Sequence, residues 1–376
     1  MIFWPILAKG SPDASPCHHH PPADIASACR SGQEPAGNAL PDRRGHGQRP
    51  NGEPQPSGLR ASDHGAGGLD LSPAAAVLPS HVRLGADWSA PLVVGLLGLE
   101  GPWHLALDRT QWKLGTRDVN ILMLAVVTRR ARVPLIWSVL DNNGGTSDSG
   151  QRIALMRRYL AIFGAASIRL LLADREFVGL AWMRFLNENN IPFAIRMKEK
   201  LLVTTEDGRR LALGSLLRKC RGVRTFRAAL DHDEARGPLW LNFAARRLED
   251  GALLIIASNT PARAALPAYR KRWAIECLFG DTKTRGLNLE DTRLVTPRKL
   301  ALLLGLVALA LAWATRTAAI LLGRKAPPRK THGYLAQSWF RIGFDQLRRL
   351  LRHDPDAAVA PWRVFASPRP KRPRVV

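Results

Sequence analysis

Four polar side chains recur at helical spacing in the stretch from residue 269 to residue 283. At 100° per residue, all four fall within about 60° of one another on one helical face: Tyr269, Arg272, Glu276 and Lys283. A carboxylate among cations suits a metal ion beside phosphate groups, because the acid can ligate the metal while the cations bind phosphate oxygens. A solvated helix face with an Arg272–Glu276 ion pair has the same spacing. This stripe alone therefore leaves both interpretations open.

Two aspartates each end a short apolar run. Asp108 follows Leu-Ala-Leu, and Asp174 follows Leu-Leu-Leu-Ala. If both runs are strands, each acid lies at the rim of a sheet, where α/β folds bind their ligands. Asp is also a common strand terminator and helix cap, so each residue alone indicates little. Together with Glu276, they supply three hard oxygen ligands, which suit one or two Mg²⁺ ions and in-line phosphoryl transfer.

The elements that must position these acids follow from the periodicity of the apolar residues. A sheet followed by alternating helices and strands predicts a mixed α/β fold. Strands are expected at 105–108, 121–128, 135–140, 168–173 and 191–196, and helices at 153–163 and 178–189. Five further strand-like runs lie between residues 201 and 258, and two of their connections carry Asp-Gly, which is typical of tight hairpins. The pattern then becomes helical, through about Gly286 and again from Arg298 to Gly323.

The charge of the chain indicates a polyanionic partner. The 376 residues include 55 Lys and Arg against 31 Asp and Glu, a formal net charge of +24. Residues 1–80 contain 6 basic and 7 acidic side chains, so the whole excess lies in residues 81–376. The same first 80 residues contain 12 Pro and 10 Gly without a sustained period, which predicts a disordered or degenerate segment.

No targeting or membrane segment is expected. The N-terminus has no basic residue before its short apolar run, and the longest apolar stretch, Leu300–Ala314, is shorter than the roughly 20 residues that a membrane helix needs. We therefore predict a cytoplasmic protein without membrane contact. The expected organisation is residues 1–80, a catalytic core in two parts at 81–196 and 259–323, a β-rich insertion at 197–258, and a basic C-terminal region at 324–376.

These residues resemble a known family. The chain resembles the DDE-type transposases of bacterial insertion sequences, in the subgroup with the signature Tyr-x2-Arg-x3-Glu-x6-Lys, which residues 269–283 match without departure. The resemblance spans roughly His104 to Leu351, and it includes Asp108-Arg-Thr-Gln-Trp-Lys-Leu-Gly, Asp174-Arg-Glu-Phe-Val-Gly and Ser338-Trp-Phe-Arg-Ile-Gly. It implies a ribonuclease H-like mixed sheet with flanking helices and a β-rich insertion before the catalytic Glu.

The resemblance also implies roles for individual residues. The metal ligands would hold two Mg²⁺ ions, for which Mn²⁺ could substitute: Asp108, Asp174 and Glu276. The phosphates of the DNA would be held by the rest of the signature: Tyr269, Arg272 and Lys283. In this family the insertion stacks an aromatic residue on a flipped base, which makes Trp240 a candidate for DNA contact. Half-buried packing within a sheet is the competing interpretation of Trp240.

The implied function is DNA transposition: metal-dependent cleavage and strand transfer at the ends of an insertion sequence. The expected partners are double-stranded DNA, both the terminal inverted repeats and the target, and a second copy of the chain on that DNA. Family members carry a helical end-binding domain before the first Asp, and residues 1–80 lack helical periodicity. A truncated or inactive remnant that binds DNA without transposing is therefore one alternative, and a cellular nuclease of ribonuclease H-like fold is another.

Overall fold

The computed structural model describes residues 85, 87–114, 117–140, 145–230, 236–283, 287, 289–292, 294, 296–331 and 335–365. Contacts divide the chain into two units, Met1–Gly67 and Gly68–Val376, and every described residue belongs to the second. Residues 1–80, for which disorder is predicted, lie outside the described residues. All strands, helices and candidate site residues that the structure describes therefore lie in the second unit.

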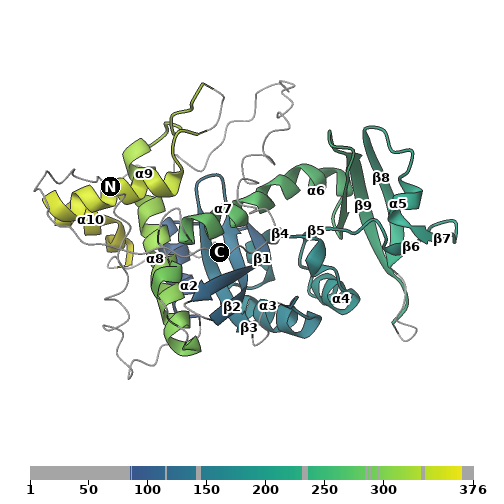
Figure 1. The fold of residues 1–376 in the computed structure, drawn as a ribbon, viewed down its shortest axis with the longest axis horizontal. Helices are drawn as coiled ribbons and strands as arrows, with labels where there is room; N and C mark the ends of the chain where they lie inside the picture. The colour runs from purple at the N-terminus through teal and green to yellow at the C-terminus, as the bar shows by residue number, and fades with distance from the viewer. Residues whose placement is uncertain are drawn as a thin grey trace, which may run out of the picture. The chain divides into compact units, whose positions relative to one another are not determined.

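Ten strands among the described residues form one mixed sheet, in the order β3-β2-β1-β4-β5-β10-β9-β8-β6-β7 (Figure 1). β1, β2 and β3 are antiparallel, whereas β4 is parallel to both β1 and β5. The strands are β1 (Trp103–Leu114), β2 (Arg117–Val127), β3 (Arg132–Leu140), β4 (Ile168–Ala173), β5 (Phe193–Arg196), β6 (Leu202–Thr205), β7 (Arg210–Ala212), β8 (Val223–Leu230), β9 (Leu239–Arg247) and β10 (Leu253–Ser258).

Helices cover both faces of the sheet. In Figure 1, α6 and α7 lie on one side of the strands, and α3 and α4 lie on the other. This cover explains why β2 is buried on both faces from Asn120 onward rather than alternating. The helices are α2 (Ser89–Leu97), α3 (Ser149–Phe163), α4 (Leu180–Glu188), α5 (Leu213–Leu216), α6 (Ala262–Tyr269), α7 (Trp273–Thr282), α8 (Pro297–Leu322), α9 (Trp339–His353) and α10 (Pro355–Val359). Short 3₁₀ turns are η3 (Ala165–Ser167), η4 (Arg175–Phe177), η5 (Arg270–Arg272), η6 (Leu289–Thr292) and η7 (Ala360–Phe365).

Local sequence explains where the helices begin and end. Asp148 caps α3 through a capping box with Gln151, and Gly164 ends this helix at a positive φ of 69°. α9 begins after Ser338, whose hydroxyl accepts a hydrogen bond from the backbone of Arg341. Each cap satisfies backbone groups that have no partner inside the helix.

The strand-like runs between residues 201 and 258 do not form a sheet of their own. β10 pairs with β9 on one side and with β5 on the other, so β6–β9 extend the sheet that carries β1 and β4. The Asp207-Gly208 pair connects β6 and β7 as the sequence predicts, with Gly208 at a φ of 81°. Which strand receives this extension depends on pairing between distant segments, which local periodicity does not specify.

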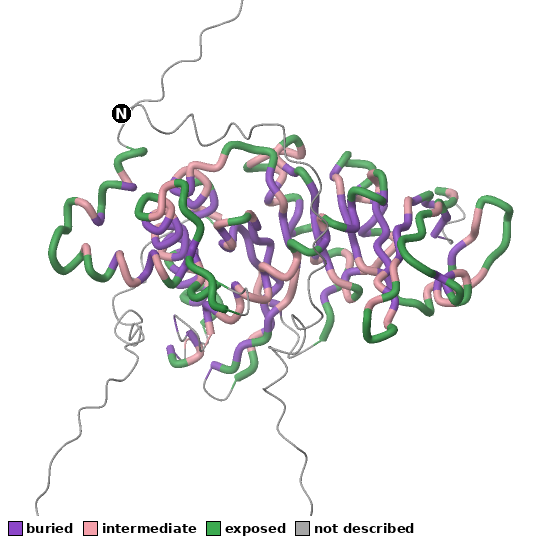
Figure 2. The backbone as a smooth tube through the Cα atoms, turned by 90° about the horizontal axis from the view of Figure 1, so that it is seen from above, coloured by how far each residue is buried: buried purple, intermediate pink, exposed green. Residues whose placement is uncertain are grey.

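α8 is a core helix. It is long and apolar enough to span a membrane by length and composition, but 67% of its most apolar window is buried. It packs against α2, α9 and β3, so protein rather than lipid covers its apolar surface. Figure 2 shows the buried residues running through the central strands and through this helix.

One strand boundary differs from the prediction. Asp108 was expected to end its strand, but β1 continues for six more residues to Leu114. From Thr110 onward, buried and exposed residues alternate, and Trp112 and Leu114 face the core. Among the described strands, this half of β1 pairs with β2 alone, so no second strand covers its other edge, and its residues alternate between buried and exposed.

Candidate active site

The first two acids come together at the end of a parallel ladder. β1 and β4 pair in parallel up to Leu107 opposite Ala173. Asp108 and Asp174 are the next residues on the two strands, which in a parallel pair lie about 4.8 Å apart. β4 ends at Ala173, whereas β1 continues past Asp108. Asp108 therefore lies at the rim of the sheet because the neighbouring strand β4 ends beside it, and not because β1 ends there.

Arg272 connects the third acid to the first. Its Nη1 lies 3.2 Å from Oδ2 of Asp108, and its Nη2 donates to Oε1 of Glu276. The Arg272 side chain is only 11% exposed, and the Asp108 side chain is 14% exposed. The single helix expected through this region is interrupted, because η5 separates α6 from α7. Arg272 is the last residue of this turn, and Glu276 lies in the first turn of α7.

Two further side chains approach the second acid. The hydroxyl of Tyr269 donates to Oδ1 of Asp174 at 3.3 Å, and Nη1 of Arg196 lies 4.0 Å from the same oxygen. Burial raises the pKa of the Tyr269 phenol above its ordinary value, so the hydroxyl keeps the proton that it donates. Tyr269, Arg272 and Glu276 of the predicted stripe therefore do face the two aspartates.

The acids crowd negative charge into a poorly solvated place. The pKa of Asp108 is raised from its ordinary value to about 7, mainly by burial and also by the carboxylates of Glu176 and Glu276. The Arg272 guanidinium and the backbone N–H of Arg109 act in the opposite direction. Burial acts to lower the pKa of Arg272, but the surrounding phenol and carboxylates outweigh it and raise this pKa. The rim thus strongly favours a positive charge between its acids.

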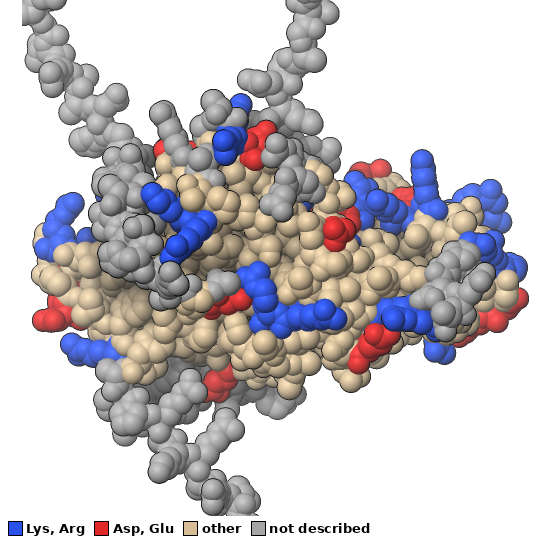
Figure 3. All heavy atoms as spheres, turned by 90° about the horizontal axis from the view of Figure 1, so that it is seen from below, with Lys and Arg blue, Asp and Glu red and all other residues tan. Residues whose placement is uncertain are grey.

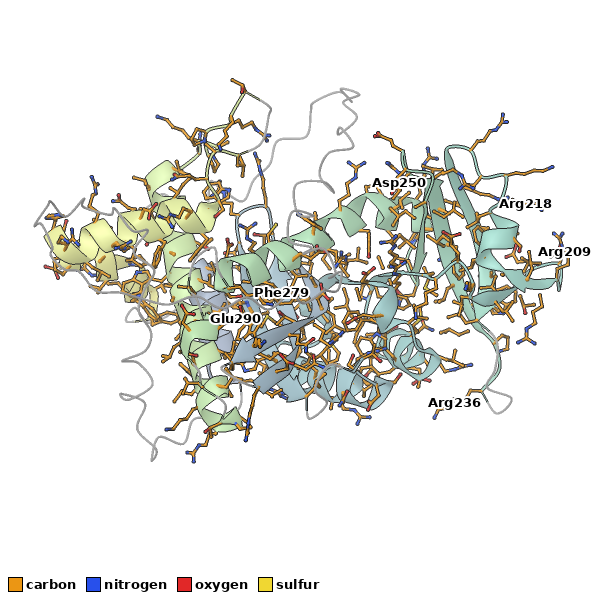
Figure 4. The ribbon with its side chains drawn as sticks, in the orientation of Figure 1. Arg209, Arg218, Arg236, Asp250, Phe279 and Glu290 are labelled. Atoms are coloured by element: carbon orange, nitrogen blue, oxygen red, sulfur yellow. The ribbon has the colours of Figure 1, made fainter. Side chains whose placement is uncertain are left out.

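Lys283 lies near these residues without contacting the three acids. Its Nζ donates to the carbonyl oxygen of Gln111 at 2.7 Å and lies 3.8 Å from Glu290. Glu290, which is labelled in Figure 4, also accepts a hydrogen bond from the backbone of Lys113. Lys283 therefore connects the end of α7 to the second half of β1, at Gln111, three residues beyond Asp108.

Trp240 is not brought to the acids. Ala244 of β9 pairs with Ile256, which pairs with Arg196 at the rim. Trp240 lies four residues from Ala244 in the direction away from the rim, about 13 Å along the strand. Its side chain is 36% exposed, and the Arg227 guanidinium carbon lies 5.3 Å from its ring centroid.

The chemistry of the donor set fits a divalent cation. Three carboxylates are hard oxygen ligands of the kind that Mg²⁺ and Mn²⁺ prefer. Among the described residues, no three His, Cys, Asp or Glu side chains lie close enough together to hold a metal ion. The Arg272 guanidinium supplies the positive charge between Asp108 and Glu276, so a bound cation would replace one of its contacts.

Sequence reasoning missed two contributors to this rim. Arg196 ends β5, which runs parallel to β4, so the same strand-end rule that selected Asp174 would have selected it. Glu176 is the second, because its carboxylate lies 3.5 Å from the Arg109 guanidinium beside Asp108. No spacing rule connects residues 109 and 176, because their approach depends on the pairing of β1 with β4.

Comparison with known proteins identifies the family of the chain. The sequence model of a family described as "Transposase DDE domain" matches residues 99–313. Because the match covers more than half of the chain, the protein belongs to this family. The comparison with curated protein sequences found no match.

Among solved structures, the chain is similar to a chain in the cryo-EM structure of the piggyBac transposase synaptic complex with hairpin DNA. The identity is 9% and the TM-score 0.35, over 73% of this chain and 56% of that one. A second similarity is to a chain in the simian T-cell lymphotropic virus intasome in complex with PP2A regulatory subunit B56 gamma. Its identity is 11% and its TM-score 0.22, over 47% of this chain and 79% of that one.

Proposed function

We propose that this protein is the DNA transposase of an insertion sequence, which cleaves DNA at the element's ends and joins the freed strand to a target. The observation that carries the proposal is the placement of Asp108 beside Asp174, with Glu276 held next to Asp108 through Arg272. The order β3-β2-β1-β4-β5 supports a ribonuclease H-like core, which β6–β10 extend before α6 and α7.

The three carboxylates would hold one or two divalent cations, Mg²⁺ or Mn²⁺. When bound, such cations activate an attacking oxygen and stabilise a leaving one during phosphoryl transfer. The chain itself sets the positions of the acids: parallel pairing holds Asp108 and Asp174, and α7 holds Glu276. Tyr269 and Arg196 restrain the carboxylate of Asp174 from the side of β5 and α6.

The cations of the stripe would bind the DNA backbone. The guanidinium of Arg272 has the planar fork that binds phosphate oxygens, and it lies at the acids where the reacting phosphate must arrive. Lys283 is partly exposed beside β1 and would bind a phosphate further along the strand. Trp240 remains a predicted DNA contact, at a place remote from the reacting bond.

The proposed substrates are the terminal inverted repeats and a target duplex, bound by two copies of the chain in the cytoplasm. The surface supports a polyanionic partner. Figure 3 shows Lys and Arg side chains spread over the end of the molecule that carries β6–β9, seen from below. Figure 4 shows Arg209, Arg218 and Arg236 pointing outward at the same end. These side chains can bind backbone phosphates without reading the base sequence.

The test is a cleavage assay with purified protein, Mg²⁺ and labelled duplexes that carry or lack the repeats flanking the gene. We expect cleavage of the repeat-bearing duplex by the wild type and none above background by Asp108→Asn, Asp174→Asn or Glu276→Gln, with DNA binding kept. Arg157→Gln is the control, because Arg157 is exposed on α3 across the sheet from α7.

The outcomes separate the alternatives. Mg²⁺-dependent cleavage that survives all three acid substitutions would refute the assigned site. Cleavage without preference for the repeats would indicate a cellular nuclease instead. Binding without any cleavage by the wild type would indicate an inactive remnant.

A further inference from the structure

A basic cavity lies beside the candidate active site, on a different side of α7. Its volume is about 240 Å³, and its walls are the β2–β3 turn, the segment from Arg270 to Cys277, and the first turn of α9. This volume is far above the roughly 30 Å³ of one water and below the 300–1,000 Å³ of typical small-molecule pockets. A group the size of a phosphodiester fits it better than a complete cofactor does.

The walls carry positive charge and no acid. Five basic side chains line the cavity, and no Asp or Glu does: Arg129, Arg130, Arg132, Arg270 and Lys271. Three of them have partners within the protein. Arg132 pairs with Asp281 at 2.9 Å, Arg130 lies over the ring of Trp339 at 5.1 Å, and Lys271 approaches His104.

The remaining two basic side chains of the cavity wall belong to Arg129 and Arg270. Both are exposed, and neither forms a hydrogen bond or ion pair with any residue that the structure describes. Their repulsion is therefore not offset from within these parts of the chain, and an anion in the cavity would offset it. The first turn of α9 forms part of the same wall, and helix N-termini carry partial positive charge.

η5 connects this cavity to the acids. It consists of three consecutive basic residues, and residues of a 3₁₀ helix are about 120° apart around its axis. Arg272 points to Asp108 and Glu276, Lys271 approaches His104, and Arg270 lines the cavity. One turn thus presents cations to two separate places at once.

We propose that this cavity binds a backbone phosphate of the DNA that flanks the bond held at the acids, through Arg129 and Arg270. This inference rests on the proposed transposase function, because it takes DNA as the ligand. The cavity is a second phosphate site, outside the Tyr269–Lys283 stripe, and it fixes the path of the DNA past the β2–β3 turn.

The test measures the salt dependence of DNA binding, without cleavage. Fluorescence anisotropy with a labelled duplex in EDTA, at several KCl concentrations, gives the slope of log K against log salt. Each phosphate contact contributes about 0.9 to this slope. We expect the double variant Arg129→Gln/Arg270→Gln to reduce the slope by about 0.9, because the two side chains hold one phosphate, and each single variant to reduce it by part of that amount.

Arg157→Gln is the matched control, because it removes one exposed positive charge on α3. Melting temperatures of all variants check that the fold is intact, as expected for exposed side chains. A double variant with the wild-type slope would overturn the proposal, and so would an equal change in Arg157→Gln.

Cys277 provides a second readout, because its partly buried thiol lines the cavity. Its alkylation by iodoacetamide, followed by peptide mass spectrometry, should slow in the presence of the duplex. The double variant should lose this protection. Equal protection in wild type and double variant would place the DNA elsewhere and overturn the proposal.

The two proposals fail separately. A protein that shows the predicted slopes but never cleaves would refute the proposed chemistry and leave the cavity assignment intact. An active enzyme with unchanged slopes in the Arg129 and Arg270 variants would refute only the cavity assignment.

Discussion

Gly343 is the contact point between α9 and α8, and its replacement by Ala should destabilise the fold. A Cβ atom built at Gly343 would lie 1.7 Å from the carbonyl oxygen of Ala314 and 3.1 Å from the Cβ of Ala318. Both neighbours belong to α8, and the nearer one is backbone that cannot rotate away. Only a displacement of one helix can relieve the clash.

The size of the effect depends on that displacement. A carbon–oxygen contact needs about 3.3 Å, so the helices must separate by roughly 1.6 Å at this point. Gaps of only 0.5–1 Å already forfeit a quarter to a half of a dispersion contact. The loss affects the buried face of α9, which comprises Trp339, Phe340, Phe344 and Leu347. Overpacking typically destabilises a protein by about 1–3 kcal/mol, and a clash with backbone lies at the upper end of this range. The higher helix propensity of Ala relative to Gly offsets about 1 kcal/mol of this loss.

We therefore expect Gly343→Ala to lower the free energy of unfolding by about 2 kcal/mol, and the melting temperature by about 4–8 °C. Differential scanning fluorimetry and calorimetry measure this shift. Gly85→Ala is the matched control, because Gly85 is exposed and a Cβ atom built there meets nothing within 4 Å, so the added methyl should leave stability unchanged. A Gly343→Ala protein that melts at or above the wild-type temperature would refute the packing argument.

Three further predictions concern single side chains. Burial, aided by the charges of Lys271 and Arg169, lowers the pKa of His104 from 6.5 to about 4, so the unfolded chain takes up this proton first. The contribution of His104 to stability should therefore fall as pH drops from about 6.5 to about 4, whereas the raised pKa of Asp108 acts in the opposite direction and is shared by both proteins compared. The melting temperature of His104→Gln should thus rise relative to that of the wild type as pH drops through this range, and a constant difference between the two would contradict the assignment. Lys283→Ala should weaken DNA binding and reduce the salt slope by about 0.9, which anisotropy measures against Arg157→Gln. Trp240→Ala should weaken DNA binding by about 1 kcal/mol, roughly fivefold, with most of the loss restored in Trp240→Phe; equal affinity in all three proteins would leave Trp240 a sheet-packing residue.

Local sequence was sufficient for most elements and for three members of the stripe. Period-two and period-3.6 patterns predicted the strands and helices of the core, and Asp207-Gly208 predicted the turn between β6 and β7. The spacing from Tyr269 to Glu276 placed these side chains on one side of the helix even though η5 interrupts it. Such features depend on residues within a few positions of one another, which is the range over which periodicity and turn chemistry act.

The contacts that create the site belong to the tertiary structure alone. Asp108 becomes a rim residue because β4 ends beside it, and Arg272 reaches it across 164 positions of sequence. The roles of the Ser338-Trp-Phe-Arg-Ile-Gly motif are likewise visible only in the tertiary structure. Ser338 caps α9, Trp339 lies under Arg130, and Gly343 allows α9 to approach α8 closely. The sequence by itself predicted most of the elements and selected the candidate acids. Pairing between distant segments decided which acids meet, because the partner of a strand or helix face is selected by packing over the whole core and not by its own pattern.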